Sequence, residues 1–352
     1  MSKPRIAIVG IGRLGSFHTK LVKAGDLFEL VAIVEPVDAA RHVATAEFSV
    51  RGAADIEEIV DEIDCAIIAT PTIYHFDVAQ KLLQAGKHLL IEKPISLELA
   101  QANDLIELAE ANELILQIGH VERFNPAFSA VANHVSTPLF IDAVRTSNYS
   151  FRSTDIGVTL DLMIHDIDLV LSLVDSPITA IDAVGSVVIG PHEDIANARL
   201  TFENGAFANL TASRVNSEPQ RTMRIEGSQG STKIDFVAST AYTIDASAQT
   251  DLLQIDLPNT SSELEALQAR FFIDYLPKTE VDVPTGNALA LEQEDFATAI
   301  INGEAVQVSG RDGRDALAVA IEISDQICNK QQASPHAVTG PHFATDTAKS
   351  QV

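Results

Sequence analysis

The stretch Arg5-Ile6-Ala7-Ile8-Val9-Gly10-Ile11-Gly12-Arg13-Leu14-Gly15 decides the fold of the first part of the chain. Its residues 6–9 are apolar without interruption, which is typical of a strand buried on both faces. The glycines after them form a G-x-G-x-x-G pattern, and helical spacing follows until Gly25. This order of strand, tight turn and helix binds the pyrophosphate of a dinucleotide, because the helix N-terminus offers free N–H groups. We expect that contact at Gly10, Gly12, Arg13, Leu14 and Gly15.

Outward from this stretch, short apolar runs alternate with helical patterns up to residue 119. The expected strands cover residues 30–34, 65–69, 88–91 and 114–118, and the expected helices cover residues 13–24, 74–85 and 97–111. We expect Ser96 to be the N-cap of the last of these helices. Such alternation predicts a parallel, doubly wound sheet of the Rossmann type, and so an α/β fold.

The pattern changes after Gly119, where the strand candidates alternate polar with apolar residues. Asn204-Gly205 predicts a hairpin between residues 199–202 and 206–212, and residues 158–173, 288–301 and 315–328 have helical spacing. We expect an α+β domain with a large, mostly antiparallel, open sheet. The predicted domains are residues 1–119, residues 120–328, with the last helices packing back toward the first domain, and a polar tail at 329–352.

The composition of the chain argues against some classes of binding partner. The 352 residues carry a formal net charge of -25 and contain no basic run, which argues against nucleic acid and anionic membranes. We find no targeting segment and no apolar stretch near the length of about 18 residues that a membrane span needs. Cys65 and Cys328 lie outside any metal-ligand spacing, so both are expected to be reduced thiols in or near the core of a cytoplasmic protein.

Two further positions suit a bound dinucleotide. Glu35 follows Gly15 by twenty residues, at the end of the second strand, where a carboxylate accepts hydrogen bonds from the adenosine ribose. Since that charge repels a 2′-phosphate, NAD is favoured over NADP. Arg41 is nearby, so NADP is not excluded as the cofactor. Thr70-Pro71 lies at the carboxyl end of a strand, the edge where ligands of such sheets gather.

Several motifs together resemble one known family. They are the glycine pattern, Thr70-Pro71 with His75, Glu92-Lys93-Pro94, residues 119–126 (Gly-His-Val-Glu-Arg-Phe-Asn-Pro) and Asp161-Leu162-Met163-Ile164-His165. The combination is similar to the Gfo/Idh/MocA oxidoreductases over about residues 3–328. The resemblance implies cofactor contacts at Thr70, Pro71, His75, Glu92 and Lys93. It also implies a homodimer or homotetramer formed through the open sheet, and a reacting carbon flanked by Lys93 and His165, with Asp161 in the family's aspartate position.

One departure from the family pattern indicates a narrower class of substrate. Residues 157–160 read Gly-Val-Thr-Leu, where the family often has three glycines. With residues 161–168 and 119–126, this variant looks similar to UDP-N-acetylglucosamine 3-dehydrogenases. The implied reaction is oxidation at C3 of that nucleotide sugar, in a lipid A-type precursor pathway. An inositol or hexose dehydrogenase, and a non-catalytic regulator that senses a dinucleotide, stay open as alternatives.

The chemistry needs a base for the hydroxyl proton and a donor for the developing oxyanion. Asp161 and His165 are four residues apart on one predicted helix, so the carboxylate can orient the imidazole. We expect His165 to accept the proton while Lys93 polarises the same oxygen, although the reverse roles fit equally well. Arg123 and Arg152 are candidates for a diphosphate. No metal is expected, because no second histidine lies at ligand spacing from His165.

Overall fold

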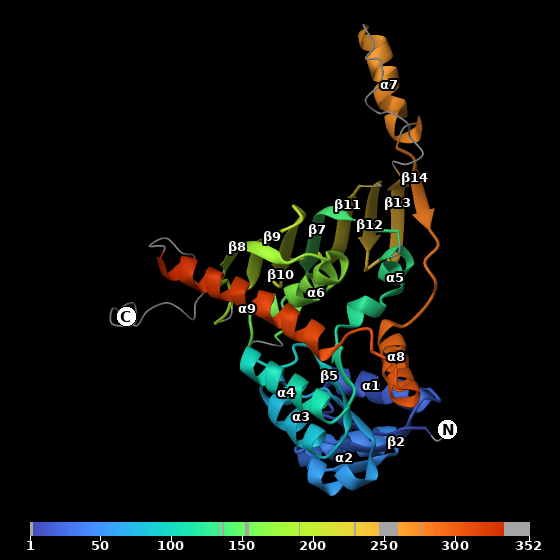
Figure 1. Cartoon of the computed structure of the whole chain (residues 1–352), viewed down its shortest axis with the longest axis vertical. Coiled ribbons are helices and arrows are strands. Elements are labelled where there is room, and N and C mark those ends of the chain that lie inside the picture. The colour runs from blue at the N-terminus through green and yellow to red at the C-terminus, as the bar shows by residue number, and fades with distance from the viewer. Residues whose placement is uncertain are drawn as a thin grey trace. The chain divides into compact units, whose positions relative to one another are not determined.

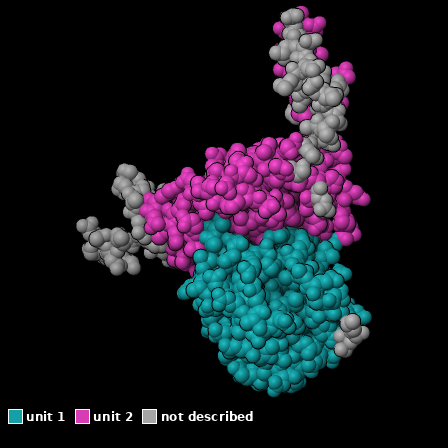
Figure 2. Space-filling view, in the orientation of Figure 1, with its two compact units in different colours: residues 1–124, 286–319 teal, residues 125–285, 320–352 magenta. Residues whose placement is uncertain are grey.

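The computed structural model describes residues 3–132, 134–135, 137–151, 155–189, 191–228, 230–245, 260–274 and 276–333. The chain divides into two compact units (Figure 2). Each unit has its own sheet. Unit 1 comprises residues 1–124 and 286–319, and unit 2 comprises residues 125–285 and 320–352.

Unit 1 is built on a six-stranded parallel sheet, as predicted, with the order β3-β2-β1-β4-β5-β6. The chain runs outward from β1 to β3 and returns to place β4 against the other side of β1. Ligands of such sheets bind at this reversal, outside the carboxyl ends of the strands. The strands are β1 (Arg5–Val9), β2 (Glu29–Val34), β3 (Arg51–Ala53), β4 (Cys65–Ile68), β5 (His88–Glu92) and β6 (Leu116–Gly119).

Helices cover both faces of this sheet (Figure 1). Right-handed crossovers place helices on opposite faces when the chain moves in opposite directions along the sheet. Accordingly α1 contacts α2 and α8, whereas α3 contacts α4. Phe296 of α8 is fully buried with Ile8, Ile33 and Ile67 in the core beneath α1. The helices are α1 (Arg13–Ala24), α2 (Asp38–Phe48), α3 (His75–Gln84), α4 (Leu99–Ala111) and α8 (Ala288–Asn302).

One predicted helix start in unit 1 is wrong. The N-cap of α4 is Glu98, and Ser96 lies outside the helix. The Ser96 hydroxyl donates to the carbonyl oxygen of Glu98 at 2.8 Å, so it serves the turn before the helix instead of capping it. The helix therefore begins at Leu99 and not at residue 97. The sequence patterns also gave no sign of α2 or the short β3.

Unit 2 contains an eight-stranded sheet with the order β14-β13-β12-β11-β7-β10-β9-β8. Neighbouring strands are antiparallel except for β7 and β10, which are parallel, so the predicted mostly antiparallel sheet is confirmed. The predicted hairpin joins β9 and β10, with Gly205 at a φ of 87°. The strands are β7 (Pro138–Thr146), β8 (Ile178–Ser186), β9 (Ile195–Phe202), β10 (Phe207–Ser213), β11 (Gln220–Gly227), β12 (Gly230–Asp235), β13 (Thr240–Asp245) and β14 (Lys278–Val281).

The helix expected over residues 158–173 has two parts. Thr159–Met163 is a π-helical turn, in which Ile164 N–H bonds the carbonyl of Thr159, and α6 (Ile164–Leu173) continues from it and packs on β7 and β10. A π-turn adds one residue to the helical repeat and often marks a functional site. The other helices are α5 (Pro126–Ala132), α7 (Ser261–Asp274) and α9 (Gly310–Ala333), which continues past residue 329, where we expected the tail to begin.

Two buried ion pairs lie on either side of the π-turn. Arg145 on β7 binds Asp166 through two parallel hydrogen bonds of 2.9 and 2.7 Å, and both residues are buried. Arg214 donates to Asp194 at 2.7 Å and to the carbonyl of Ile156 at 2.9 Å. Bidentate guanidinium–carboxylate pairs are geometrically specific. The pairs therefore hold the backbone on both sides of the π-turn.

The cysteines differ in their surroundings. Cys65 on β4 is fully buried, and burial raises the pKa of its thiol well above the ordinary value. Cys328 on α9 is exposed, so the expectation of two core or near-core thiols is wrong for this residue. Ile327, its neighbour on α9, is 2% exposed, so the helix turns the two successive side chains to different surroundings. None of the helices in the described ranges is both long enough and apolar enough to cross a membrane.

The Arg145–Asp166 pair gives a stability prediction. Replacing Asp166→Ala leaves a buried guanidinium without its main counter-charge, which costs about 3–5 kcal/mol in the free energy of unfolding. The matched control is Asp182→Ala, which removes an exposed ion pair to Lys330 and should cost less than about 1 kcal/mol. Urea denaturation followed by circular dichroism measures both. Equal losses in the two variants would contradict the anchoring role of the buried pair.

Candidate active site

The three glycines of the first turn have different physical roles. Gly10 has a φ of 88°, and a Cβ there would lie 2.8 Å from the backbone nitrogen of Thr70. A Cβ on Gly15 would lie 1.9 Å from the carbonyl oxygen of Gly10, so α1 can approach β1 only with glycine at this position. A Cβ on Gly12 would meet no described atom within 4 Å. Two glycines thus serve packing, and the third leaves the backbone open to a ligand.

The N-terminus of α1 has the features of an anion site. Its N-cap Gly12 provides no side-chain cap, and the first turn of this fully described helix contains no acidic residue. Gly12, Arg13 and Leu14 are exposed. Uncapped N–H groups and the positive end of the helix dipole favour a bound anion. The residues present therefore fit the pyrophosphate of a dinucleotide.

Glu35 lies where the sequence predicts, directly after β2. Its two carboxylate oxygens accept hydrogen bonds from the backbone N–H groups of Ile11 and Val37 at 3.2 and 3.0 Å. Each oxygen keeps a further lone pair for a hydroxyl group. Arg41 donates to the carbonyl oxygen of Glu35 at 2.7 Å and is ion-paired with Asp38, so its guanidinium is held against the protein's own groups.

His75 contacts two loops at the carboxyl edge of the sheet. It is 1% exposed, with Nδ1 2.8 Å from the carbonyl oxygen of Pro94 and Nε2 2.9 Å from that of Thr70. Burial lowers the pKa of His75, against the opposing effect of these carbonyls, so the neutral ring donates to one of them at a time. We therefore assign His75 to positioning the Thr70-Pro71 and Lys93-Pro94 segments. The hydroxyl oxygen of Thr70 is buried with no partner among the described residues.

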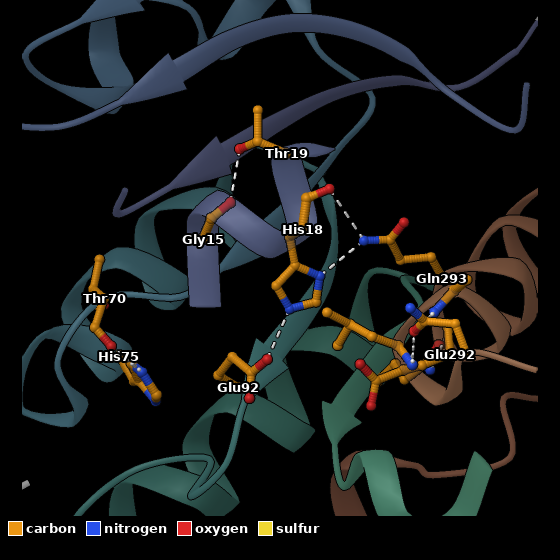
Figure 3. Close-up of polar contacts among 12 residues, drawn as sticks. Gly15, His18, Thr19, Thr70, His75, Glu92, Glu292 and Gln293 are labelled. Atoms are coloured by element: carbon orange, nitrogen blue, oxygen red, sulfur yellow. Dashed lines mark hydrogen bonds and ion pairs between the residues drawn. The ribbon is translucent and has the colours of Figure 1, made fainter. Parts of the chain in front are cut away.

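Glu92 points into unit 1 and is 7% exposed. Its Oε1 lies 2.7 Å from His18 Nε2, and Gln293 on α8 lies 2.9 Å from the other ring nitrogen of His18 (Figure 3). A Cβ on Gly119 would lie 3.0 Å from Glu92 Oε2, so a glycine on β6 makes room for this carboxylate. Glu92 therefore bonds to His18 inside unit 1, and its predicted contact with the cofactor stays a prediction.

The predicted catalytic residues are distributed over both units. Lys93 follows β5 directly in unit 1 and is half-buried. Asp161 is in the π-turn and His165 in the first turn of α6, both in unit 2 and both half-buried. Their convergence on one substrate oxygen stays a prediction. The Asp161–His165 spacing spans a π-to-α change instead of the continuous α-helix that we expected.

Arg123 is the predicted phosphate ligand that lies within the described residues. Arg123 is buried, and its guanidinium lies 3.5 Å from Asp312, which already supplies a counter-charge. Arg152 lies outside the described residues. Both stay predictions as substrate contacts.

Comparison with known proteins now identifies the family. The profile described as "Oxidoreductase family, NAD-binding Rossmann fold" matches residues 4–120, and that of the "GFO/IDH/MocA C-terminal domain" matches residues 118–233. The chain belongs to the Gfo/Idh/MocA family. It is thus an oxidoreductase with an NAD-binding Rossmann domain, as the sequence motifs indicated.

Individual relatives of this Gfo/Idh/MocA protein act on sugars and polyols. UDP-N-acetylglucosamine 3-dehydrogenase of Acidithiobacillus ferrooxidans is 35% identical over 321 residues, which cover 91% of this chain and 96% of that protein. A solved structure of that enzyme superimposes with a TM-score of 0.81 and covers 93% of this chain and 98% of the other. The scyllo-inositol 2-dehydrogenase (NAD(+)) of Bacillus subtilis is 27% identical over 346 residues, covering 92% and 94% of the two chains.

Sequence reasoning missed the buried polar residues that hold the Gfo/Idh/MocA site in place. These are His18, Glu292, Gln293, Arg145 and Asp194. His18, Gln293, Arg145 and Asp194 each pair with a residue at least 20 positions away, and Glu292 lies near Glu92 and His18, so no local spacing indicates these contacts. The one available signal was a histidine three residues after Gly15, on the face of the helix that also carries the buried Thr19 and Val22.

The glycine geometry predicts two opposite outcomes. Gly15→Ala forces α1 away from β1, so we expect a loss of about 1–3 kcal/mol in the free energy of unfolding together with loss of NADH binding. Gly12→Ala has space for its methyl group and a compatible backbone, so stability should change by less than about 0.5 kcal/mol while NADH binds more weakly. Thermal unfolding and NADH titration by calorimetry measure these effects. A Gly15→Ala protein as stable as the wild type would show that the close approach is dispensable.

Proposed function

We propose that this chain is an NAD-dependent dehydrogenase that oxidises the C3 hydroxyl of UDP-N-acetylglucosamine to a ketone. The observation that carries the proposal is the similarity to UDP-N-acetylglucosamine 3-dehydrogenase, which extends over 96% of that enzyme at 35% identity. Lys93, Asp161 and His165, the residues proposed for the chemistry, all lie within the residues that the two family profiles match.

The cofactor proposed is NAD, which accepts a hydride from the substrate carbon when bound. The N-terminus of α1 holds its pyrophosphate, and Glu35 accepts hydrogen bonds from the adenosine ribose. The Glu35 charge disfavours a 2′-phosphate. Arg41 does not offset this charge, because Asp38 and the backbone of Glu35 already bind its guanidinium. NAD is therefore favoured over NADP.

The protein's own residues move the proton. In the proposed arrangement His165 accepts the hydroxyl proton, and Asp161 orients the imidazole and stabilises its charged form. The Lys93 ammonium donates to the same oxygen and stabilises its negative charge. The exchange of roles between Lys93 and His165 is an equal alternative.

The substrate's diphosphate needs positive groups in a protein of net charge -25. Arg123 and Arg152 are the groups proposed for it. Arg214 donates to Asp194 and to the carbonyl of Ile156, so we assign it a structural role. We also propose a homo-oligomer in the cytoplasm.

An inositol dehydrogenase is the second candidate, because the Bacillus subtilis enzyme that acts on scyllo-inositol matches 92% of this chain. Its lower identity of 27% makes it the weaker proposal. The two substrates differ in charge, so a requirement for a nucleoside diphosphate separates them.

Cofactor choice tests the role of Glu35. Glu35→Gln removes the negative charge facing the ribose and keeps the size of the side chain. We expect weaker NAD⁺ binding and a fall of about tenfold in the preference for NAD⁺ over NADP⁺, since tenfold corresponds to about 1.4 kcal/mol of lost repulsion. The measurement is kcat/KM with each cofactor. Glu29→Gln, at the exposed far end of β2, is the control and should keep the wild-type preference. An unchanged preference in Glu35→Gln would remove this carboxylate from the cofactor site.

Substrate choice tests the proposed function. With NAD⁺, the wild type should form NADH with UDP-N-acetylglucosamine at a kcat/KM at least about tenfold above that with myo-inositol. Lys93→Ala and His165→Ala should each lower this rate about 10²–10⁴-fold, as expected for loss of a proton-transfer or oxyanion-stabilising group. Lys87→Ala, before the opposite end of β5, is the matched control.

Two results would overturn the proposal in different ways. Activity with myo-inositol alone would favour the inositol dehydrogenase. Absence of NADH formation with either alcohol, with Lys93→Ala binding NADH like the wild type, would favour a regulator that senses the dinucleotide.

A further inference from the structure

Four polar side chains meet inside unit 1, between the glycine-turn helix and the strand that leads to Lys93. They are His18 on α1, Glu92 on β5, and Glu292 and Gln293 on α8 (Figure 3). His18 and Glu292 are 0% exposed, Gln293 is 2% and Glu92 is 7% exposed. Two carboxylates this deep in a protein require an explanation, since a buried charge is stable only with a partner.

Hydrogen bonding fixes the proton on His18. Gln293 Nε2 lies 2.9 Å from His18 Nδ1 and 3.4 Å from the His18 carbonyl oxygen. A carbonyl oxygen only accepts, so the amide nitrogen faces both atoms as a donor and Nδ1 must accept. The ring hydrogen is then on Nε2, which donates to Glu92 Oε1 at 2.7 Å. A neutral His18 therefore supports one anion, Glu92.

The Glu292 carboxyl group receives no comparable hydrogen bond from the described residues. Both of its carboxylate oxygens are buried without a hydrogen-bond partner among the described residues, although its backbone carbonyl accepts from Gln117 Nε2 at 3.1 Å. One of these oxygens lies within 4.8 Å of both the Glu92 and His18 ligand atoms. Burial is the largest cause that raises the pKa of Glu292 well above its ordinary value, followed by the negative charges of Glu92 and Asp295.

Other titratable and charged groups lie on the elements around α8. His18 is on α1, Glu92 on β5, His120 follows β6, and the 3-10 turn Val121–Phe124 carries Glu122 and Arg123. Arg123 lies 3.5 Å from Asp312, on α9, and so has its own counter-ion. On α8 itself, the negative charge of Asp295 raises the pKa of Glu292 further.

We infer that Glu292 is held as a neutral carboxylic acid and acts as a positioning residue for the dinucleotide site. In this form Glu92 is the only charge of the cluster, and α1, β5 and α8 stay joined through His18. The cluster connects the helix that receives the pyrophosphate to the strand that ends at Lys93. Ionised Glu292 would place a second anion beside Glu92 and push these elements apart.

A bound metal ion is a poorer match to the same three groups. Ligands at about 2.0–2.1 Å from a tetrahedral zinc ion lie about 3.3 Å apart, whereas His18 Nε2 and Glu92 Oε1 are 2.7 Å apart. That distance suits a shared hydrogen. The nitrogen that would bind the metal also carries that hydrogen.

The test compares Glu292→Gln with Glu294→Gln. Glutamine reproduces the shape and neutrality of the protonated acid, and Glu294 is an exposed residue on the same helix. We would measure chemical unfolding by circular dichroism and NADH binding by calorimetry from pH 5 to pH 9 on the full chain. Because the raised pKa makes the folded wild type bind one more proton than the unfolded chain, its unfolding equilibrium should shift toward unfolding as pH rises above about 4.5, by up to tenfold per pH unit.

Three results are expected. The wild type and Glu294→Gln share this dependence on pH and bind NADH more weakly at alkaline pH. Glu292→Gln has a flatter dependence and keeps its NADH affinity at pH 9. Wild-type protein at pH 7 gives an infrared band of a protonated carboxyl group that Glu292→Gln lacks.

Other results would overturn the inference. Glu292→Gln unfolding more easily than the wild type at every pH would mean that Glu292 works as an anion. Stabilisation of the wild type but not of Glu292→Gln by Zn²⁺ or Mn²⁺ would indicate a metal site. Identical pH dependence in all three proteins would place the titration elsewhere. None of these measurements involves a sugar, so they are independent of the proposed substrate.

Discussion

The contact between Gly15 and the carbonyl of Gly10 is the constraint on which the first unit depends. It places α1 so close to β1 that no side chain fits between them, and this brings the helix N-terminus to the reversal point of the sheet. The same placement carries His18 inward, three residues further along α1, to the buried end of Glu92. One glycine thus sets both the anion site at the surface and the polar cluster beneath it.

The sequence predicted unit 1 well because its signals are local. An uninterrupted apolar run such as Ile6–Val9, followed by a glycine turn and a helical repeat, needs no information from the rest of the chain. The exceptions have local causes as well. Ser96 has the right residue type for a cap, but its hydroxyl bonds to the Glu98 carbonyl, and the helix starts later. Residue type alone does not decide between these two hydrogen bonds.

The candidate site was only partly predictable, for the opposite reason. Motif residues such as Glu35 and Glu92 could be placed at strand ends, but the direction of their side chains depends on distant partners. Glu92 points inward because it bonds to His18, which lies 74 positions earlier in the sequence. His18 is held in turn by Gln293, on a helix near the end of the chain. The π-turn at Asp161 likewise follows from tertiary contacts, since Glu193 binds the backbone of Val158 and Thr159 from another part of unit 2.

The parallel pairing of β7 with β10 has a consequence for how the second unit forms. Strands β8, β9 and β10 are consecutive antiparallel neighbours, so they can assemble from short-range contacts. Strand β7 must instead pair with β10 across the sixty residues that separate Thr146 from Phe207, and with β11 across a longer segment. Closing a large loop is entropically unfavourable, and non-local pairing slows folding. Among the strands of this sheet, β7 therefore has the pairings that close the longest loops.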